Sequence, residues 1–206
     1  MRTHLILSDF HIPDYNKELI RPLLNLIKDL QPDKLHILGD FINLTKASKY
    51  DPDPYYHVEL SEEIEEGTRI LTKLRKVMKG EILWFEGNHE LRLIKFLARN
   101  ALALAELNIE GERIVSIPHL FNLRELGVKY VGMFDNHREG DVLFEHGSMV
   151  RIKSGYTAHA MIERRGMSGI IGHTHRLSLV TKTLSGRSMF WIENGCMCNL
   201  NPTPRY

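Results

Sequence analysis

Short apolar runs alternate with amphipathic stretches through the first half of the chain. The runs at 4–8, 35–38 and 82–85 have strand length and are almost continuously apolar, which is typical of buried strands in a parallel sheet. Between and after them, leucine and isoleucine recur at helical spacing over about 16–30, 55–79 and 90–107. This order of strands and helices predicts a largely parallel sheet with right-handed crossovers.

The second half of the chain has a different pattern. It predicts short strands at 113–117, 128–133, 142–145, 169–171, 177–183 and 188–192, and one helix at 156–165. We expect a turn at 136–140 and a hairpin connection at 184–187, where Gly186 is the turn residue. Two sheets packed face to face, with helices outside, would accommodate these elements. No repeat or linker divides the chain, so we predict a single domain over residues 1–206.

Composition narrows the class of protein. The chain is 43% hydrophobic and 26% charged, as in ordinary soluble domains. A formal net charge of +1 gives no general basic field for nucleic acid or membrane, although a local basic cluster would suffice for a nucleic-acid substrate. No apolar stretch approaches the roughly 20 residues that span a bilayer. The first residues enter a strand without a signal-peptide pattern, so we expect a cytoplasmic, intracellular protein.

The two cysteines, Cys196 and Cys198, are separated by one residue. An intracellular chain rarely keeps disulfides. We expect neither a second cysteine pair nor a nearby histidine to support a metal or redox role for these two thiols. We therefore expect them to be reduced and structurally incidental.

Polar clusters follow five of the predicted strands. Because ligands bind at the carboxyl ends of the strands in open α/β sheets, we expect all five clusters to converge on one pocket. Their carboxylates, carboxamide and imidazoles suit divalent metal ions and phosphate chemistry. The clusters are Asp9-Phe10-His11, Gly39-Asp40, Gly87-Asn88-His89-Glu90, His146-Gly147 and Gly172-His173-Thr174-His175.

The spacing within the clusters suggests how they bind metal. Asp9 and His11 are two residues apart, as are His173 and His175, so each pair faces one side if the backbone stays extended. Asp40 stands alone and is suited to bridge two cations. Two ions roughly 3.5–4 Å apart would polarise a phosphoryl oxygen and hold a bridging hydroxide for in-line attack. For any single residue, a role as a cap, a turn residue or a satisfied core histidine is an alternative.

The five clusters, in order from residue 9 to residue 175, resemble the motifs of the calcineurin-like metallophosphoesterase superfamily. No long insertion separates them, which indicates a compact member without a cap domain. The resemblance implies a four-layered α/β/β/α sandwich with two mixed sheets flanked by helices and a metal site at the strand carboxyl ends. It also implies two divalent ions per chain, with manganese favoured and iron or zinc as alternatives.

The resemblance also implies roles for individual residues. His89 would lie outside the metal shell, contact the phosphate and act on the leaving oxygen, so that His89 and Asp40 are the expected catalytic residues. Asp40 would bridge the two metals. The implied ligands are Asp9, His11, Asp40 and His175 for the first metal, and Asp40, Asn88, His146 and His173 for the second.

Three positions depart from the Ser/Thr protein phosphatases of this superfamily. Asn43 and Leu44 stand where those enzymes have Asp and Arg, and Glu86 replaces the Arg before Gly-Asn-His-Glu. The two missing guanidiniums would have bound a phosphate dianion, so a protein phosphatase is disfavoured. Asn43, in the second shell, would orient His89 without adding charge, which suits leaving groups of low basicity. Capping of the following turn is the alternative role for Asn43.

The predicted function is therefore a metal-dependent phosphoesterase (a hydrolase) with phosphodiesters favoured. A phosphomonoesterase acting on nucleotides or proteins and a metal-dependent nuclease are alternatives. A non-enzymatic scaffold is disfavoured because every ligand position is filled. The expected partner is a phosphate ester, including a nucleotide or nucleic acid. Apolar residues on more than one side of the third helix permit an oligomer. Candidate substrate contacts, each alternatively a solvated surface residue, are Arg92, Arg151 and Arg176.

Overall fold

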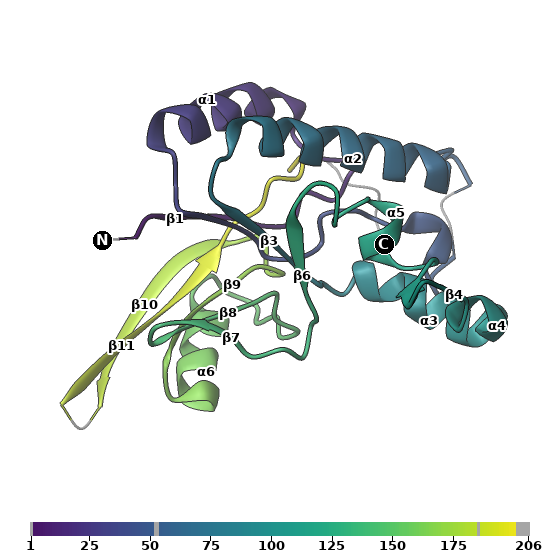
Figure 1. The fold of residues 1–206 in the computed structure, drawn as a ribbon. Helices are drawn as coiled ribbons and strands as arrows, with labels where there is room; N and C mark the ends of the chain where they lie inside the picture. The colour runs from purple at the N-terminus through teal and green to yellow at the C-terminus, as the bar shows by residue number, and fades with distance from the viewer. Residues whose placement is uncertain (1, 52–53, 185, 201–206) are drawn as a thin grey trace.

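The computed structural model describes residues 2–51, 54–184 and 186–200 and has four layers (Figure 1). Helices α1 (Ile20–Leu30) and α2 (Leu60–Val77) cover the outer face of a first sheet. Its strands run in the spatial order β1 (His4–Leu7), β2 (Lys34–Ile37), β3 (Glu81–Phe85) and β6 (Val128–Val131). Every pair in this sheet is parallel.

A second sheet packs against the inner face of the first, and helix α6 (Tyr156–Arg165) covers its other face. Its spatial order is β10 (Leu177–Leu184), β11 (Arg187–Asn194), β9 (Ser168–Ile171), β8 (Val142–Glu145) and β7 (His137–Glu139). The β10–β11 and β7–β8 pairs are antiparallel, whereas β9 pairs in parallel with both of its neighbours. The expected α/β/β/α sandwich is confirmed.

The alternation of side chains along each strand builds the layers. On β3, Trp84 packs in the cluster beneath the helices, whereas Phe85 faces the second sheet. On β8, Phe144 faces the first sheet, whereas Leu143 packs with α6. Strands buried on both faces have no polar side, which explains their continuous apolar runs.

The prediction of two mixed sheets is wrong for the first sheet, which is entirely parallel. Each of its strands returns through a crossover that contains a helix, and such connections join parallel strands. Only the second sheet is mixed, because short hairpins connect β7 to β8 and β10 to β11. The turn between β10 and β11 contains Ser185, which lies outside the described residues.

Several element boundaries differ from the prediction. The expected strand at 113–117 is wrong: β4 (Asn108–Ile109) and β5 (Glu112–Arg113) form a small hairpin, and α5 (Ile117–Leu120) follows. Ser116 caps α5 by accepting from the His119 N–H, and proline stands in its first turn, which favours a helix start over a strand. Residues 136–140, expected as a turn, contain β7.

The helices are shorter than the periodicity predicts. The stretch 90–107 divides into α3 (Glu90–Asn100) and α4 (Leu102–Ala105) at Ala101, whose φ of −155° is not helical. Helix α2 begins after Glu59, which forms a capping box with Glu62. A short 3₁₀ helix, η1 (Lys17–Leu19), precedes α1. A second one, η2 (Thr45–Ala47), follows the second polar cluster.

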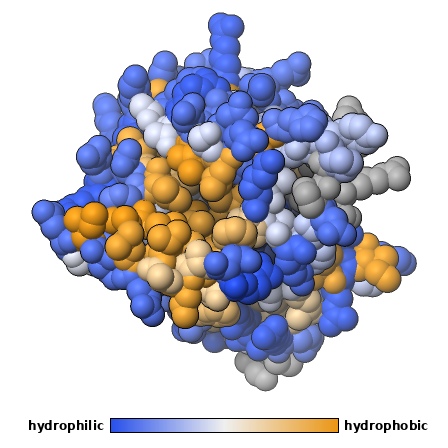
Figure 2. Space-filling view, turned by 90° about the vertical axis from the view of Figure 1, so that its right-hand side faces the viewer, coloured by the Kyte–Doolittle hydropathy of each residue, from blue (hydrophilic) through white to orange (hydrophobic). Residues whose placement is uncertain are grey.

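Apolar side chains gather on the side of the molecule where α3, α4 and α5 lie (Figure 2). The exposed residues of this region are Ile94, Phe96, Leu102, Leu104, Leu107 and Ile109. Within the described ranges, no helix combines the length and apolar character needed to cross a bilayer. The oligomeric state and the single-domain assignment stay predictions.

Candidate metal centre

The five polar clusters lie at the carboxyl ends of β1, β2, β3, β8 and β9, so both sheets contribute to one region. Three overlapping groups of side chains there have metal-ligating atoms within 4.8 Å of one another. The first group is Asp9, His11 and His175, and the second is Asp40, His146 and His173. The third group, His11, Asp40 and His89, shares residues with both. The division between the first two groups coincides with the two ligand sets that the resemblance implied, although the ligand roles themselves stay predictions.

In the first group, three side chains from different motifs meet closely. The Nε2 atom of His175 lies 3.2 Å from Asp9 Oδ1 and 2.9 Å from His11 Nε2. Asp9 is fully buried, and its Oδ2 also accepts the His173 N–H at 2.9 Å. Burial opposes ionisation of Asp9, but hydrogen bonds from His11 and His175 hold its pKa below the usual value.

In the second group, Asp40 lies between the two sets of ligands. Its Oδ2 is 3.3 Å from His146 Nε2 and 3.8 Å from His11 Nε2, and its Oδ1 accepts the His89 N–H at 2.9 Å. The side chain of Asn88 joins this group, since its Oδ1 lies 3.0 Å from His146 Nε2. Asp40 therefore lies between both groups of imidazoles, and its bridging role stays a prediction.

The hydrogen bonds of His146 leave its Nε2 facing the Asp40 carboxylate. Its Nδ1 lies 2.7 Å from the Leu38 carbonyl oxygen, which only accepts, so Nδ1 carries the proton. Nε2 then faces the Asp40 carboxylate, which requires a second proton or a metal ion between them. Burial opposes the charge, but Asp40 prevails and raises the pKa of His146 to about 10. A divalent ion would replace this proton and satisfy the same atoms.

Asn43 orients His11 in the way that the Leu38 carbonyl oxygen orients His146. Asn43 Oδ1 lies 3.0 Å from His11 Nδ1, and its Nδ2 donates to Asp14 Oδ2 at 2.7 Å. Asn43 Oδ1 therefore accepts, so His11 donates from Nδ1 and directs Nε2 toward the carboxylates. Tyr56 donates to the same Asp14 oxygen at 3.1 Å. One of the two side-chain bonds described here reaches a predicted metal ligand, His11, and the other reaches Asp14, whereas the sequence suggested that Asn43 orients His89.

The backbone at the predicted ligands is not extended. Asp9, His11, Asp40, His173 and His175 all have positive φ angles, between 47° and 64°. Residues other than glycine rarely adopt this left-handed backbone conformation, and such strain clusters at functional sites. The expectation that Asp9 and His11 share a side through extended geometry is therefore wrong. Alternating left-handed residues, rather than a strand, bring the two side chains to the same point.

Glycines make room for this approach. A Cβ on Gly172 would collide with Ser8 Oγ and with the Asp9 carboxylate, and a Cβ on Gly87 would collide with Asp40. Close packing between two clusters thus requires glycine at positions 172 and 87.

Glu90 supports the Asp40 loop, a role that the sequence reasoning missed. It is 1% exposed, and its carboxylate accepts backbone N–H groups from Asp40 at 2.9 Å, Phe41 at 2.8 Å and Gly87 at 2.8 Å. Burial and the charge of Asp40 raise its pKa. Its place in the third cluster was the available signal, but nothing local indicated that its partners would be backbone amides of another strand end.

His89 and Arg92 form a pair at the rim of the centre. Arg92 donates from Nη2 to His89 Nε2 at 2.9 Å and from Nη1 to the Asn43 carbonyl oxygen at 2.9 Å. Burial lowers the pKa of His89 to about 3 against the opposing charge of Asp40, so the imidazole is neutral. His89 Nε2 lies 3.9 Å from Asp40 Oδ2 and is grouped with His11 and Asp40 as a possible metal ligand. Its predicted place outside the metal shell stays a prediction.

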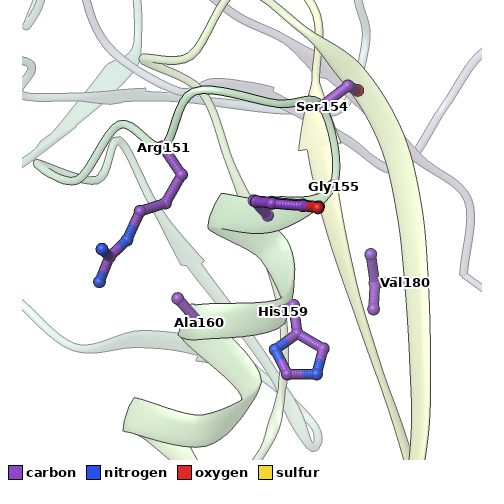
Figure 3. Close-up of a pocket in the computed structure, with 7 residues that line it drawn as sticks. Arg151, Ser154, Gly155, His159, Ala160 and Val180 are labelled. Atoms are coloured by element: carbon purple, nitrogen blue, oxygen red, sulfur yellow. The ribbon is translucent and has the colours of Figure 1, made fainter.

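The other two arginine candidates lie together beside a pocket. Arg176 donates to the backbone carbonyl of Arg151, and the Arg151 side chain lines a pocket of about 620 Å³ at the start of α6 (Figure 3). In that view, Arg151 and Val180 lie on opposite sides of the first turn of α6. Their predicted contact with substrate stays a prediction.

The expectation that no histidine lies near the cysteine pair is wrong. His175 Nδ1 lies 3.8 Å from Cys198 Sγ, and both thiols and this imidazole have ligand atoms within 4.8 Å of one another. The sequence separates His175 from the cysteines by the whole β10–β11 hairpin. The return of β11 alongside β10 brings them together.

The layer order and the position of all five clusters at one edge of the two sheets agree with what the resemblance implied. The chain has the α/β/β/α fold that the resemblance implied.

Comparisons with known proteins give distant similarities, and no family model matches the chain. The Gene 54 protein of Mycobacterium phage D29 is 28% identical over 194 residues, covering 87% of this chain and 71% of that protein. The Gene 54 protein of Mycobacterium phage L5 is 27% identical over 217 residues, covering 95% of this chain and 79% of that protein.

Three solved structures align with most of the chain at low identity. Yfce, a phosphoesterase from E. coli, has a TM-score of 0.45 and 13% identity over 98% of this chain and 84% of that chain. The Pseudomonas putida nuclease MPE has a TM-score of 0.43 and 15% identity, covering 94% of this chain and 73% of that chain. A Vps29 mutant from Entamoeba histolytica has a TM-score of 0.41 and 13% identity, covering 93% of this chain and 73% of that chain.

Proposed function

We propose that this protein is a metal-dependent phosphoesterase that holds two divalent ions. The observation that carries the proposal is the position of Asp40 Oδ2, which faces His146 Nε2 at 3.3 Å and His11 Nε2 at 3.8 Å. His11 and His146 each direct a ring nitrogen at this buried carboxylate while the other ring nitrogen is held by an acceptor. Nitrogen and oxygen donors of this kind suit Mn²⁺, Fe or Zn²⁺.

When bound, two such ions would supply Lewis acidity at the phosphate and activate a water molecule as nucleophile. Asp9, His11 and His175 would hold the first ion, Asn88, His146 and His173 the second, and Asp40 both. The chain's own contribution is to keep these side chains in place. The Asn43 and Leu38 oxygens set the tautomers of His11 and His146, and such supporting contacts fix the orientation of metal-ligating imidazoles.

The surroundings of His89 favour phosphodiesters. Its lowered pKa of about 3 makes it a neutral imidazole. A neutral imidazole is better matched to a leaving group of low basicity than to a strongly basic leaving group. The two positions where a phosphatase has arginine supply no cation. Leu44 is fully buried, and Glu86 accepts from the Tyr130 hydroxyl at 3.1 Å and the Met133 N–H at 3.1 Å. A diester carries one negative charge fewer than a monoester dianion, so it needs less cationic support.

The test compares two chromogenic substrates on the protein loaded with Mn²⁺. We expect faster hydrolysis of bis(p-nitrophenyl) phosphate than of p-nitrophenyl phosphate, and metal analysis should give two ions per chain. Asp40→Asn should reduce hydrolysis by roughly a thousandfold, because the removed charge supports several kcal/mol of transition-state stabilisation. The matched control is Asp141→Asn, an exposed carboxylate in the turn between β7 and β8.

Three outcomes would contradict parts of the proposal. Full activity in Asp40→Asn would exclude the mechanism. A higher rate on the monoester would replace the diesterase with a phosphomonoesterase. Fewer than one ion per chain, with no rise on adding Mn²⁺, would support the non-enzymatic scaffold. Single-stranded DNA as a third substrate tests the nuclease alternative.

A further inference from the structure

A separate group of metal-ligating atoms, which contains both cysteines, adjoins the centre on the side away from the carboxylates. It consists of Cys196, Cys198 and the Nδ1 side of His175, with the ligand atoms all within 4.8 Å of one another. The two ring nitrogens of His175 therefore have different neighbours. Its Nε2 points at Asp9 and His11, whereas its Nδ1 points at the Cys198 thiol.

The chain that carries the thiols is held firmly against the metal-binding loops. The Met197 N–H donates to the carbonyl oxygens of Ser8 at 2.9 Å and Asp9 at 3.1 Å. The Met197 carbonyl accepts from the Asn16 N–H at 2.9 Å. Cys198, at 4% exposure, pairs with Tyr15 in an antiparallel bridge. These bonds on both sides of Met197 fix the positions from which the two cysteines project.

The spacing agrees with tetrahedral coordination. With Zn–S bonds near 2.3 Å and Zn–N bonds near 2.05 Å, the sulfur–nitrogen edge of a tetrahedron is about 3.6 Å. The observed distance from Cys198 Sγ to His175 Nδ1 is 3.8 Å. The side chain of His175 is 37% exposed, which leaves a path for an ion and room for water as the fourth ligand.

We propose that Cys196, Cys198 and His175 Nδ1 form a binding site for a thiophilic divalent ion such as Zn²⁺, Cd²⁺ or Co²⁺. Two thiolates and one imidazole are soft-to-borderline ligands, whereas the predicted ligands of the neighbouring centre are carboxylates, a carboxamide and imidazoles without a thiolate, so the cysteine site favours more thiophilic ions. Binding releases the thiol protons to solvent.

The site shares one imidazole with the first metal of the proposed phosphoesterase centre. A neutral imidazole has one lone pair for a metal, and its proton occupies the other nitrogen. When Nδ1 binds an ion, the proton moves to Nε2, which can then no longer serve the first metal. We therefore expect thiophilic ions to inhibit hydrolysis through the cysteines, a consequence that rests on the proposed function.

The direct test is a titration of the reduced, metal-free protein with Co²⁺, followed by the sulfur-to-cobalt charge-transfer band. Only thiolate ligands produce this band, so Co²⁺ in the carboxylate centre does not contribute to it. We expect the band to saturate at one Co²⁺ per chain. Cys196→Ser, Cys198→Ser and His175→Ala should each weaken the binding that the band reports by at least roughly tenfold, and added Zn²⁺ should abolish the band.

The matched control is His146→Ala, which removes a ligand of the other group and should leave this affinity unchanged. His175→Gln repeats the histidine test with a larger side chain, and circular dichroism checks that each variant folds. A missing band, or equal affinity in the wild type and both folded His175 variants, would overturn the proposal. The band is independent of hydrolysis, so this result stays separate from a failure of the phosphoesterase assignment.

Discussion

Two groups of histidines in the described part of the chain can be compared directly. One surrounds Asp9 and Asp40 at the strand carboxyl ends. The other consists of His4, His36 and His137, which pack with Phe85 and Phe144 between the sheets. Both groups contain fully or nearly buried imidazoles, yet His36 in one group and His146 in the other have pKa values that are shifted in opposite directions.

His36 shows the effect of burial without a carboxylate in contact. It is 0% exposed, its ring stacks on Phe144 with centroids 4.4 Å apart, and its Nε2 lies 3.0 Å from His4 Nδ1. Burial and the neighbouring histidines lower its pKa to about 3. At His146 burial acts in the same direction, but Asp40 raises the pKa to about 10. The neighbouring charge, not the number of histidines, therefore distinguishes a candidate metal centre from a packed core.

The largest contrast should come from removing one imidazole of the metal centre. We expect His146→Ala to lower hydrolysis by more than about 100-fold, beyond the 10–100-fold typical of supporting contacts around a metal. The measurement is the rate on the diester with saturating Mn²⁺, together with the metal content. If His146→Ala kept its second ion and its rate, the distinction between the two groups would fail.

An intermediate effect is expected for Asn43→Ala, which removes the acceptor that orients His11. Metal affinity should fall by roughly 10–100-fold, with partial recovery of the rate at high Mn²⁺. The control is Asn25→Ala on the exposed face of α1. An unchanged Mn²⁺ dependence would show that the Asn43 contact has no part in metal binding.

The smallest effect on activity is expected in the other group. His36→Phe should leave hydrolysis at neutral pH unchanged, because His36 touches no predicted ligand in the contacts described above. It should alter acid stability. The unfolded His36 binds a proton near pH 6.5 and the folded one only near pH 3, so between these values the unfolded chain binds more protons. Stability is therefore lost as the pH falls.

From pH 7.5 to pH 5 the wild type should lose about 2 kcal/mol more of its free energy of unfolding than His36→Phe, as measured by urea unfolding at both values. Equal losses would show that His36 is not the neutral core histidine that its surroundings indicate. Reduced activity in the variant would instead connect this group with the metal centre.

Much of the architecture could be predicted because its signals are local. A continuous apolar run such as 82–85, followed by Gly87 and Asn88, indicates a buried strand and a polar end within a few residues. The alternation of such runs with helical periods specifies a parallel sheet. The mixed pairing that the resemblance implied for the first sheet was wrong, and so was the strand expected at 113–117. A short apolar stretch such as 113–117 has no periodicity that separates strand from helix.

Some features of the site could likewise be predicted from local signals, and others could not. The residue types and their order predict a group of ligands near one edge, because strand carboxyl ends meet there whatever the details of the loops. The partners of Asn43 and Glu90 could not be predicted, since each bonds to a segment far away in the sequence. Nor could the left-handed backbone at Asp9 and His11, which depends on packing against other loops.

By itself, the sequence determined the alternation of strands and helices in the first half, the five strand ends and the chemistry that they carry, because these follow from hydrophobic period and residue type. The α/β/β/α order was implied by the resemblance of the motifs. Only the tertiary structure decided which imidazoles face a carboxylate and which face an aromatic ring, and so the opposite pKa shifts of His146 and His36. It also placed Cys198 beside His175. The physical reason is that electrostatic and coordination contacts act over a few ångströms, and the folded chain, not sequence distance, sets which atoms lie that close.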